Sequence, residues 1–384
     1  MNLPPNKIII LTHYTSLYGA NLSLLTFLKN TSICLTNFIV ILPNNGELSL
    51  ELDKLNIKYI YYWYPLNVNN SEYAAYTRFK SAIKKIRYIF QLYKLIKNLE
   101  PRLIYSNSSV LYYGFFISKL LRIPHIWHLR EFGTLDYQLI PDFGLNFQKK
   151  LLSINTFNIA ISQSITHHYN LKNKNSETVY NGVVKEDELT KKFEYSNFKT
   201  DLNFGVVGVI VPYKNQLEII KAFHLLLESK DKCFKNCKLY LIGEGSGEYY
   251  ETILQYINSQ RLEENVILTG HIKETERIYA LFDILINGSI YEGFGRVTVE
   301  AMSYGKIPIG YNHSGNAELI ENEVTGLLFN DFNALYSILL KISIDKNYLR
   351  ELQIKMKNSF KKEFTIEHYC KSMDCVFSKY INPN

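Results

Sequence analysis

Residues 286–315, INGSIYEGFGRVTVEAMSYGKIPIGYNHSG, contain the pattern that decides the fold. The stretch leaves an apolar run at 284–288, passes through a glycine-flanked loop into a helical segment, and ends in a second apolar run at 306–311. Strands that alternate with helices are typical of a parallel sheet covered by helices. Two glutamates, Glu292 and Glu300, lie eight positions apart within it. Because an unpaired buried carboxylate is costly, this pair points to a ligand rather than to a packed core.

The same alternation extends in both directions along the chain. Six apolar runs in the first half are expected to form strands: KIIILTH, FIVIL, LIYS, HIWHL, FNIAIS and TVYNG. Five more follow in the second half: NFGVVGV, KLYLIG, NVILTG, ILING and KIPIGY. Right-handed crossovers place the ends of parallel strands along one edge of a sheet. We therefore predict an α/β fold of two Rossmann-like, doubly wound domains that face each other across a ligand-binding cleft.

The domain boundary is predicted from a change in composition. Residues 185–202 are charged and lose the apolar periodicity, so we place a linker there. The N-terminal domain would then cover residues 1–184 and the C-terminal domain residues 203–364. Apolar residues at intervals of three or four predict an amphipathic helix over 365–381, which could pack back on the first domain.

The composition indicates a globular protein. The chain has 384 residues, 47% of them hydrophobic, which is enough for two cores. Charged residues make up 21% without a long like-charge block, which argues against extended disorder. The formal charge of +7 favours an acidic ligand or surface but is modest for a nucleic-acid-binding domain, so no nucleic-acid partner is expected.

The N-terminal segment and the cysteines bear on location. The first twenty residues lack the basic region and cleavage site of a secretory signal, and no window reaches the roughly 18 to 20 apolar residues of a membrane span. We therefore expect a cytoplasmic protein, with membrane contact limited to peripheral contact on the inner face of the plasma membrane. The cysteines fit neither a disulfide framework nor a paired zinc site, and we interpret them as reduced thiols: Cys34, Cys233, Cys237, Cys370 and Cys375.

The glycine loop around Phe294 is suited to an anion. Gly293 and Gly295 let the backbone approach a ligand closely, and a helix that begins near Gly295 directs amide N–H groups at it. Glu300 would then lie in the second turn while Glu292 stays in the loop, so the two carboxylates can meet different ends of an elongated ligand. Carboxylates accept hydrogen bonds from neighbouring sugar hydroxyls, which suits a nucleotide sugar.

These residues resemble the donor-site signature of GT-B fold, retaining glycosyltransferases of family 4. The signature comprises Ser289-x-x-Glu292-Gly-Phe-Gly, Glu300-Ala-Met, Gly305, Pro308 and Gly326-Leu-Leu. The likeness covers most of the chain in the family's order, through YGANLSLL, IPHIWHLREFG, IAISQSI, VYNGV, GVIVPYKNQ, LIGEGSGEYY and VILTGHI. A pair of glutamates alone would be a weak signal, whereas this ordered set is a specific one.

The resemblance implies donor-binding roles for the matching residues. Glu300 would hold the ribose hydroxyls, Glu292 would hold hydroxyls of the transferred sugar, and Lys214 would contact the diphosphate. The phosphate cradle would be completed by the backbone at four consecutive positions: Phe294, Gly295, Arg296 and Val297.

The resemblance also implies a role for the N-terminal domain. Gly19 would let this domain approach the donor, and His128 would lie at the reacting edge of the cleft, forming the catalytic pair with Glu292. A satisfied core histidine is the alternative for His128. Arg130 and Glu131 follow directly as acceptor-side candidates, where Arg130 could steer a charged acceptor or orient Glu131.

One departure from the family pattern concerns the diphosphate. Relatives carry Gly-Arg-Leu ahead of the lysine, whereas this chain has Gly208, Val209 and Ile210. Val209 cannot bind a phosphate, so we hypothesise that Arg296 supplies the missing charge; the alternative is that Arg296 is a solvated surface residue.

The segment LIGEGSGEYY does not fit a dinucleotide site. Gly243, Gly245 and Gly247 give G-x-G-x-G, whereas the dinucleotide fingerprint requires G-x-G-x-x-G. We expect no bound cofactor and no metal, and UDP is favoured over GDP as the donor nucleotide.

The run from Arg78 to Arg102 is strongly basic. It contains eight basic residues against one acid, Glu100, and an apolar stripe at helical spacing. Two interpretations stay open: the helix lies on an anionic leaflet, or its stripe packs in the domain core. The stripe comprises Phe79, Ile83, Ile86, Phe90, Tyr93 and Ile96.

The resemblance implies a hexosyltransferase-type reaction. A sugar would pass from a nucleotide-diphosphate donor to a hydroxyl of a glycan or lipid-linked acceptor, with retention and without a metal, in the synthesis of a bacterial capsule, lipopolysaccharide or related cell-surface polysaccharide. No D-x-D pair lies in a plausible loop, in agreement with a metal-independent reaction. The alternatives are a nucleotide-sugar epimerase of the same fold and a non-catalytic assembly partner.

Overall fold

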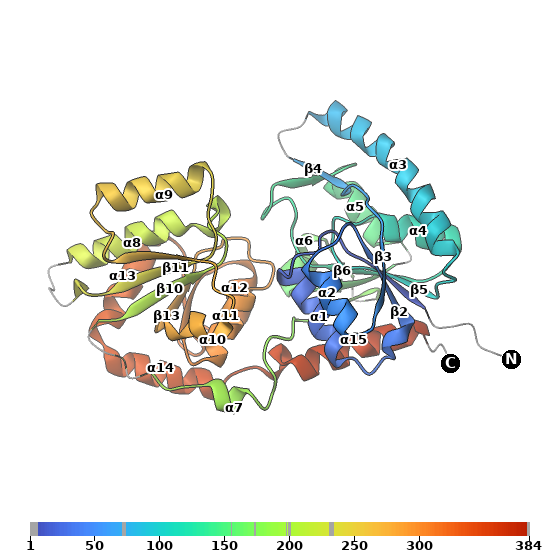
Figure 1. Cartoon of the computed structure of the whole chain (residues 1–384). Helices are drawn as coiled ribbons and strands as arrows, with labels where there is room; N and C mark the ends of the chain where they lie inside the picture. The colour runs from blue at the N-terminus through green and yellow to red at the C-terminus, as the bar shows by residue number, and fades with distance from the viewer. Residues whose placement is uncertain are drawn as a thin grey trace. The chain divides into compact units, whose positions relative to one another are not determined.

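The chain folds into two compact units, each described here by itself. The structure, a computed structural model, describes residues 7–70, 74–154, 156–172, 174–196, 198, 201–229 and 234–381. Unit 1 comprises Met1–Val183 together with Glu363–Asn384, and unit 2 comprises Val184–Lys362. In each unit, helices cover both faces of a central sheet (Figure 1).

Unit 1 contains a seven-stranded parallel sheet with the order β3-β2-β1-β5-β6-β8-β9. Its strands are β1 (Ile8–Leu11), β2 (Phe38–Leu42), β3 (Lys58–Tyr61), β5 (Leu103–Ser106), β6 (His125–Leu129), β8 (Phe157–Ala160) and β9 (Ser176–Thr178). A separate antiparallel ribbon pairs β4 (Val68–Asn70) with β7 (Leu139–Pro141).

The residues of β1 show how this sheet forms two cores. Ile8 and Ile10 pack on one face and Ile9 and Leu11 on the other, as the alternation of side chains along a strand requires. The first face is covered by α1 (Gly19–Asn30), α2 (Glu47–Lys54) and α15 (Ile366–Ile381), and the second by α3 (Ala75–Lys97) and α4 (Tyr113–Leu121). Short helices α5 (Leu145–Leu152) and α6 (Gln163–His168) and the 3₁₀ turns η1 (Leu35–Asn37) and η4 (Lys362–Phe364) complete the order.

The C-terminal helix α15 belongs to the core of unit 1. Its apolar side stacks Phe377 on Phe27 of α1, with ring centroids 5.2 Å apart. The buried residues of α15 include Tyr369, Met373 and Val376, which recur at the spacing that the sequence shows. The chain therefore returns to unit 1 after completing unit 2.

Unit 2 contains a six-stranded parallel sheet with the order β12-β11-β10-β13-β14-β15. Its strands are β10 (Asn203–Val207), β11 (Lys238–Ile242), β12 (Val266–Gly270), β13 (Ile284–Asn287), β14 (Ile307–Tyr311) and β15 (Leu327–Phe329). Its helices are α7 (Leu189–Lys192), α8 (Gln216–Glu228), α9 (Glu248–Ser259), α10 (Thr275–Ala280), α11 (Arg296–Ser303), α12 (Ser314–Leu319), α13 (Phe332–Ile344) and α14 (Lys346–Asn358), with a 3₁₀ turn η2 (Pro212–Lys214).

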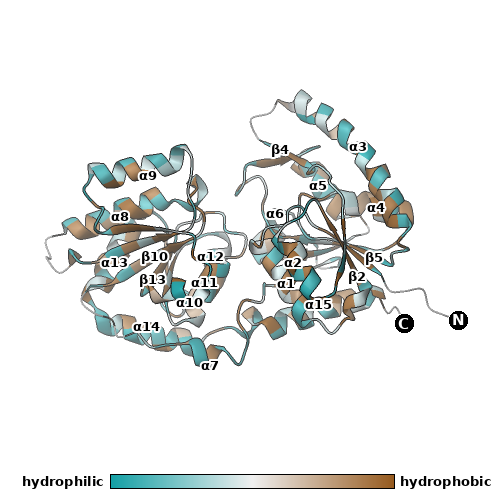
Figure 2. Ribbon diagram, in the orientation of Figure 1, coloured by the Kyte–Doolittle hydropathy of each residue, from teal (hydrophilic) through white to brown (hydrophobic). Residues whose placement is uncertain are grey.

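The fold-class prediction of an α/β protein with two Rossmann-like, doubly wound domains is confirmed. The apolar strands form the centre of each unit, as the brown ribbons in Figure 2 show. Residues 185–202, where the linker was expected, contribute Phe193, Phe198 and Leu202 to the core of unit 2.

The strands differ from the expectation at the edges of the sheets. Strands β3 and β15 were not predicted from the sequence. Strand β9 occupies residues 176–178, whereas the strand was expected at TVYNG, residues 178–182. The side chains of β3 are exposed or half-buried and β15 has only three residues, so neither gives a clear apolar run. Edge strands are short or charged in many sheets, because these features hinder pairing with another chain.

Two further features concern surroundings rather than fold. Among the described helices, none is long and apolar enough to cross a membrane. Cys34 and Cys375 are exposed and Cys237 and Cys370 are buried, no disulfide joins any two of these four residues, and Cys233 lies outside the described residues.

Candidate functional site

The sheet order of unit 2 brings two loops together. Strand β10 lies between β11 and β13, so the strand order reverses at β10. The loops that follow β10 and β13 therefore leave adjacent carboxyl ends at the switch point, where open α/β sheets bind ligands. Lys214 lies in the first loop and Glu292 in the second.

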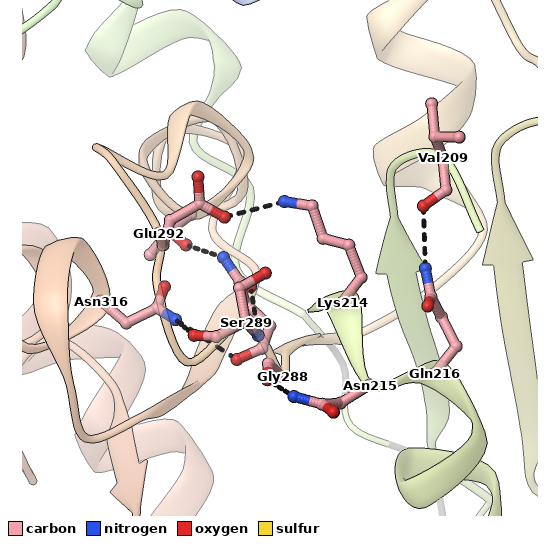
Figure 3. A network of polar contacts seen from close by, with 10 residues as sticks. Val209, Lys214, Asn215, Gln216, Gly288, Ser289, Glu292 and Asn316 are labelled. Carbon is pink, nitrogen blue, oxygen red and sulfur yellow. Dashed lines mark hydrogen bonds and ion pairs between the residues drawn. The ribbon is translucent and has the colours of Figure 1, made fainter. Parts of the chain in front are cut away.

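Lys214 and Glu292 form an ion pair across these two loops. The Lys214 Nζ lies 2.8 Å from Glu292 Oε2 (Figure 3), and the two side chains keep 23% and 16% of their surface exposed. The pair is thus half-buried and still reachable by a ligand. A cation and a carboxylate held in this way can be redirected to a phosphate and to hydroxyl groups when a ligand binds.

Hydrogen bonds to the backbone fix the loop that carries Glu292. The Asn215 side-chain amide donates to the Gly288 carbonyl at 2.8 Å, and the Asn316 amide donates to the Ser289 carbonyl at 3.1 Å (Figure 3). The backbone N–H of Gly315 donates to the Glu292 carbonyl at 2.9 Å. The loop therefore has a defined shape before any ligand arrives.

Buried polar atoms without a partner occur on or beside the loops that follow β10 and β13. They are Gln216 Oε1, Ser289 Oγ and Asn316 Oδ1, and no hydrogen-bond partner is found for them among the described residues. Leaving such an atom unpaired typically costs about 1–3 kcal/mol, so unpaired groups are rare unless a site is completed by water or a ligand.

The helix α11 begins as the glycine pattern predicts. Gly295 adopts φ +99° and caps the helix, a conformation that glycine accepts and β-branched residues do not. Phe294 is buried beneath the loop, and Arg296 and Val297 form the first turn, whose amide N–H groups point out of the helix end. With eight residues, α11 supplies a helix N-terminus at the edge where Glu292 lies.

Glu300 is held on α11 by two partners. Arg296 Nη2 lies 3.3 Å from Glu300 Oε1, one turn away, and the buried Tyr279 hydroxyl donates to Glu300 Oε2 at 2.9 Å. Glu292 and Glu300 thus have different basic partners, Lys214 and Arg296. The two predicted carboxylates and both basic residues therefore lie in the same region of unit 2.

Val209 occupies the position at which the family pattern has an arginine. Its side chain is 46% exposed, and its carbonyl accepts a hydrogen bond from Gln216 Nε2 at 3.0 Å (Figure 3). The valine offers no charge to the loop, and Arg296 is directed at Glu300 in this state.

The glycines of LIGEGSGEYY have a packing explanation. A Cβ on Gly243 would lie 2.1 Å from the Gly208 carbonyl oxygen, so the ends of β10 and β11 approach as only glycine permits. Gly247 caps α9 with φ +79°. Close backbone packing therefore accounts for Gly243, and helix capping accounts for Gly247.

In unit 1, His128 lies at the end of β6 with no exposed surface. Its Nδ1 is 2.6 Å from the Tyr105 hydroxyl and 3.3 Å from Arg130 Nη2, and its Nε2 is buried without a partner among the described residues. A guanidinium can only donate, so Nδ1 acts as the acceptor and the proton resides on Nε2. Burial, and next the Arg130 charge, hold the pKa of His128 well below its usual value.

Arg130 is bound within unit 1 rather than to Glu131. Its Nε donates to Asn107 Oδ1 at 2.8 Å, and its Nη1 donates to Asn181 Oδ1 at 3.1 Å. The hydrogen bonds that hold Arg130 therefore come from the carboxyl end of β5 and from the segment after β9. These bonds hold Arg130 beside His128, with Arg130 Nη2 3.3 Å from His128 Nδ1.

Glu131 has a separate set of donors. Its Oε1 accepts hydrogen bonds from the Ser109 backbone N–H at 2.8 Å and the Ser109 hydroxyl at 2.7 Å, and the Ser108 hydroxyl donates to it as well. Burial raises the pKa of the Glu131 carboxyl despite these donors. The nearby Asp136 is also buried, which raises its pKa to about 7.

Gly19 lies at the first residue of α1, after the loop that follows β1. A Cβ at this position would meet no heavy atom within 4 Å, so the packing of unit 1 does not require glycine there. Space at this point is consistent with close approach by another molecule, but the position is not sterically constrained by the fold itself.

Several residues that hold the site were not singled out from the sequence. In unit 1 the run SNSS at 106–109 follows a predicted strand, and polar residues at such a position are a usable signal. Tyr279 and Asn316 gave no signal, because each acts from a helix that the site motif does not include. Of the described residues, no group of three or more His, Cys, Asp or Glu is placed to hold a metal ion.

Comparison with known proteins finds one family description that matches unit 2. The model described as Glycosyl transferases group 1 matches residues 187–359. N-acetyl-alpha-D-glucosaminyl L-malate synthase of Bacillus anthracis is 25% identical over 228 residues, which are 57% of this chain and 58% of that one. The Escherichia coli UDP-Gal:alpha-D-GlcNAc-diphosphoundecaprenol alpha-1,3-galactosyltransferase is 23% identical over 325 residues, 79% of this chain and 81% of that one.

Solved structures extend the likeness to nearly the whole chain. HepE of Anabaena, in complex with UDP and glucose, superimposes with a TM-score of 0.75 at 20% identity, covering 97% of this chain and 99% of that one. This likeness shows the fold, which is GT-B. The chain spans less than two thirds of the Bacillus anthracis relative's length.

Proposed function

We propose that this chain is a glycosyltransferase that moves a sugar from a nucleotide-diphosphate sugar to a hydroxyl of a glycan or lipid-linked acceptor. The observation that carries the proposal is the arrangement in unit 2, where the ion pair Lys214–Glu292 and the pair Arg296–Glu300 flank the start of α11. The helix N-terminus and the two cations suit a diphosphate, and the two carboxylates suit hydroxyl groups on either side of it.

The relatives support UDP as the favoured nucleotide over GDP. The Escherichia coli relative is named for UDP-Gal, and the Anabaena neighbour was solved with UDP and glucose. A bacterial capsule, lipopolysaccharide or related glycan is the proposed product, since a relative in Staphylococcus aureus is described as a capsular polysaccharide biosynthesis glycosyltransferase.

The proposed reaction retains the configuration of the sugar and uses no metal. The bond from the anomeric carbon to the diphosphate breaks, the acceptor oxygen bonds to the same face, and its proton passes to the leaving phosphate oxygen. Lys214 and the first amides of α11 would stabilise the charge that develops on that phosphate. One preorganised donor of this kind is worth about 3–4 kcal/mol.

A panel of nucleotide sugars tests the proposal. UDP-sugars at a concentration of about a hundred times their Kd should stabilise the protein by about 3 kcal/mol and raise its melting temperature, whereas GDP- and ADP-sugars should do so less. Glu300→Ala should remove the shift. A protein that no nucleotide sugar stabilises would instead be the non-catalytic assembly partner.

Product analysis separates the remaining alternatives. Incubation with the donor alone should leave the sugar configuration unchanged, because conversion without an acceptor would identify an epimerase. Proton NMR of the product should show the donor's anomeric configuration, and an inverted product would refute retention. The rate should be unchanged by EDTA; a loss that a divalent cation restores would refute metal independence.

Arg296 is proposed to replace the arginine that Val209 does not provide. Its guanidinium lies on the first turn of α11 and is 3.3 Å from Glu300, so a short side-chain movement would redirect it to a diphosphate. Arg296→Ala should raise the donor KM as Lys214→Ala does. If only the lysine variant is impaired, Arg296 is a structural partner of Glu300.

A further inference from the structure

The outer side of helix α3 in unit 1 carries a row of exposed apolar side chains, here called the α3 stripe. These side chains recur at intervals of three and four residues, so they lie on one side of the helix. Their exposed fractions are 76% for Tyr76, 54% for Phe79, 50% for Ile83, 42% for Ile86 and 55% for Phe90. A single exposed apolar residue is ordinary, whereas an ordered row of five calls for a covering surface.

The inner side of the same helix is already occupied. Leu92 and Ile96 are fully buried in the core that α3 shares with α4, and Ala82 is buried as well. Lys85 is turned inward, where its Nζ pairs with Asp142 at 2.6 Å. Helix α3 (cyan) lies at the periphery of unit 1 in Figure 1, so it packs by one side and leaves the other uncovered.

The structure divides the apolar residues of this helix into a core-packed group and an exposed group. Ile96 packs in the domain core, as the second interpretation required. Phe79, Ile83, Ile86 and Phe90 are exposed instead, because the helix uses a different set of positions to contact the core. Two apolar sides on one helix gave a single apparent periodicity in the sequence.

The charges beside the α3 stripe have one sign. Lys80, Lys84 and Arg87 are exposed, and no Asp or Glu occurs between residues 75 and 99. Phe143, which is itself exposed, extends the apolar surface: its ring contacts that of Phe79 with centroids 6.4 Å apart. Aromatic and aliphatic side chains flanked by basic ones are the composition of helices that lie in a membrane interface.

We propose that the α3 stripe docks unit 1 on an anionic lipid surface. The apolar side chains would enter the boundary between headgroups and acyl chains, while the basic residues contact lipid phosphates. A second copy of the chain is a poorer occupant, since a symmetric contact would bring two basic surfaces together. The inference goes beyond the proposed function and does not depend on it, because lipid binding requires no donor.

Vesicle sedimentation tests the inference with the full chain. Anionic vesicles of phosphatidylcholine with about 30% phosphatidylglycerol should retain the protein. Vesicles of pure phosphatidylcholine should retain far less of it. Ile83→Ser with Phe90→Ser should weaken retention about tenfold or more. Replacing Lys80, Lys84 and Arg87 together by glutamine should weaken it roughly a hundredfold, and added salt should act in the same direction.

Matched controls exclude general effects of surface polarity. Leu225→Ser changes a residue that is 46% exposed on α8 of unit 2, and it should bind vesicles like the unaltered protein. Sugar transfer to a water-soluble acceptor should be unchanged in the Ile83/Phe90 variant, which also shows that the variant is folded. The proposal would be overturned if vesicles retained the Ile83/Phe90 variant as well as the unaltered protein. It would also be overturned if anionic vesicles did not retain the unaltered protein at low salt. Dimers that the substitutions abolish would instead assign the stripe to a second copy.

Discussion

At the scale of single residues, Lys214 and Glu292 neutralise each other in the absence of a ligand. Their 2.8 Å ion pair satisfies both charges without closing them off from solvent. A diphosphate would compete for the lysine and release the carboxylate to sugar hydroxyls. The pair remains partly exposed, so a ligand can reach both charges.

Lys214→Ala is the sharpest single substitution. Removing one cation from the leaving phosphate should lower donor kcat/KM roughly a hundredfold or more, the range found for one preorganised electrostatic donor. Steady-state kinetics with a saturating acceptor measure the loss. Lys221→Ala, which removes an exposed pair with Glu218 in the same unit, should leave the constants unchanged. Equal constants for Lys214→Ala and the unaltered protein would remove the lysine from the site.

At this site, local features of the sequence could be predicted, whereas a contact between residues far apart in the chain could not. The spacing of Glu292 and Glu300 and the two glycines between them were enough to predict a loop followed by a helix, because each requirement is local. The partner of Glu300 on α10, Tyr279, comes from twenty-one residues earlier in the chain. Only the tertiary fold brings that hydroxyl to the carboxylate.

At the scale of elements, the loop between β13 and α11 is shaped by a neighbouring helix. A Cβ on Gly315, in α12, would lie 2.5 Å from the Phe294 carbonyl oxygen and 2.7 Å from that of Glu292. The start of α12 thus packs directly on the loop backbone. The sequence predicted the strands on either side from their apolar runs, but it contained no sign that Gly315 is a contact for this loop.

Gly315→Ala should displace the loop that carries Glu292. We expect a loss of about 1–3 kcal/mol in the free energy of unfolding, as for overpacked sites, and weaker donor binding. Gly19→Ala is the matched control for stability, since its Cβ would meet nothing within 4 Å. Urea unfolding and donor titration measure both variants. Gly19→Ala should keep its stability but bind the donor less well; unaltered donor binding would remove Gly19 from the donor site.

At the scale of the whole molecule, the interiors of the two units could be predicted from the sequence better than the boundary between them. The sequence predicted the class and most strands of each, because buried parallel strands form apolar runs. It did not predict that the segment expected as a linker would enter the core of unit 2, since Phe193 and Phe198 are scattered among charged residues. Packing, rather than local composition, determines that boundary.

Unit 1 should be sensitive to acid. Burial, with Arg130 as a second cause at His13 and Lys119 at His125, lowers the pKa of each of these histidines to about 3. The unfolded chain takes up protons on both as pH falls below about 6.5, whereas the folded unit does not until about pH 3. Stability is therefore full above pH 6.5 and declines toward pH 3.

Asp136 and Glu131, whose pKa values are raised by burial, act in the opposite direction, but they are outnumbered, because the pKa of His128 is lowered along with those of His13 and His125. Burial raises the pKa of Asp136 to about 7, so its folded form gains stability as pH falls from about 7 to 4. The two tryptophans of the sequence, Trp63 and Trp127, both lie in unit 1, so their fluorescence follows this unit. The urea midpoint should fall between pH 7 and pH 5. A midpoint that rises over this range would contradict the balance.

The central claim is that a nucleotide-diphosphate sugar binds where the loops after β10 and β13 meet at the start of α11. Hydrogen–deuterium exchange of the full chain with and without saturating UDP tests it most directly. Exchange should slow at residues 212–216 and 288–299, and the slowing should be absent in the Glu300→Ala variant. Unchanged exchange in both segments while UDP is demonstrably bound would place the nucleotide elsewhere and contradict the account.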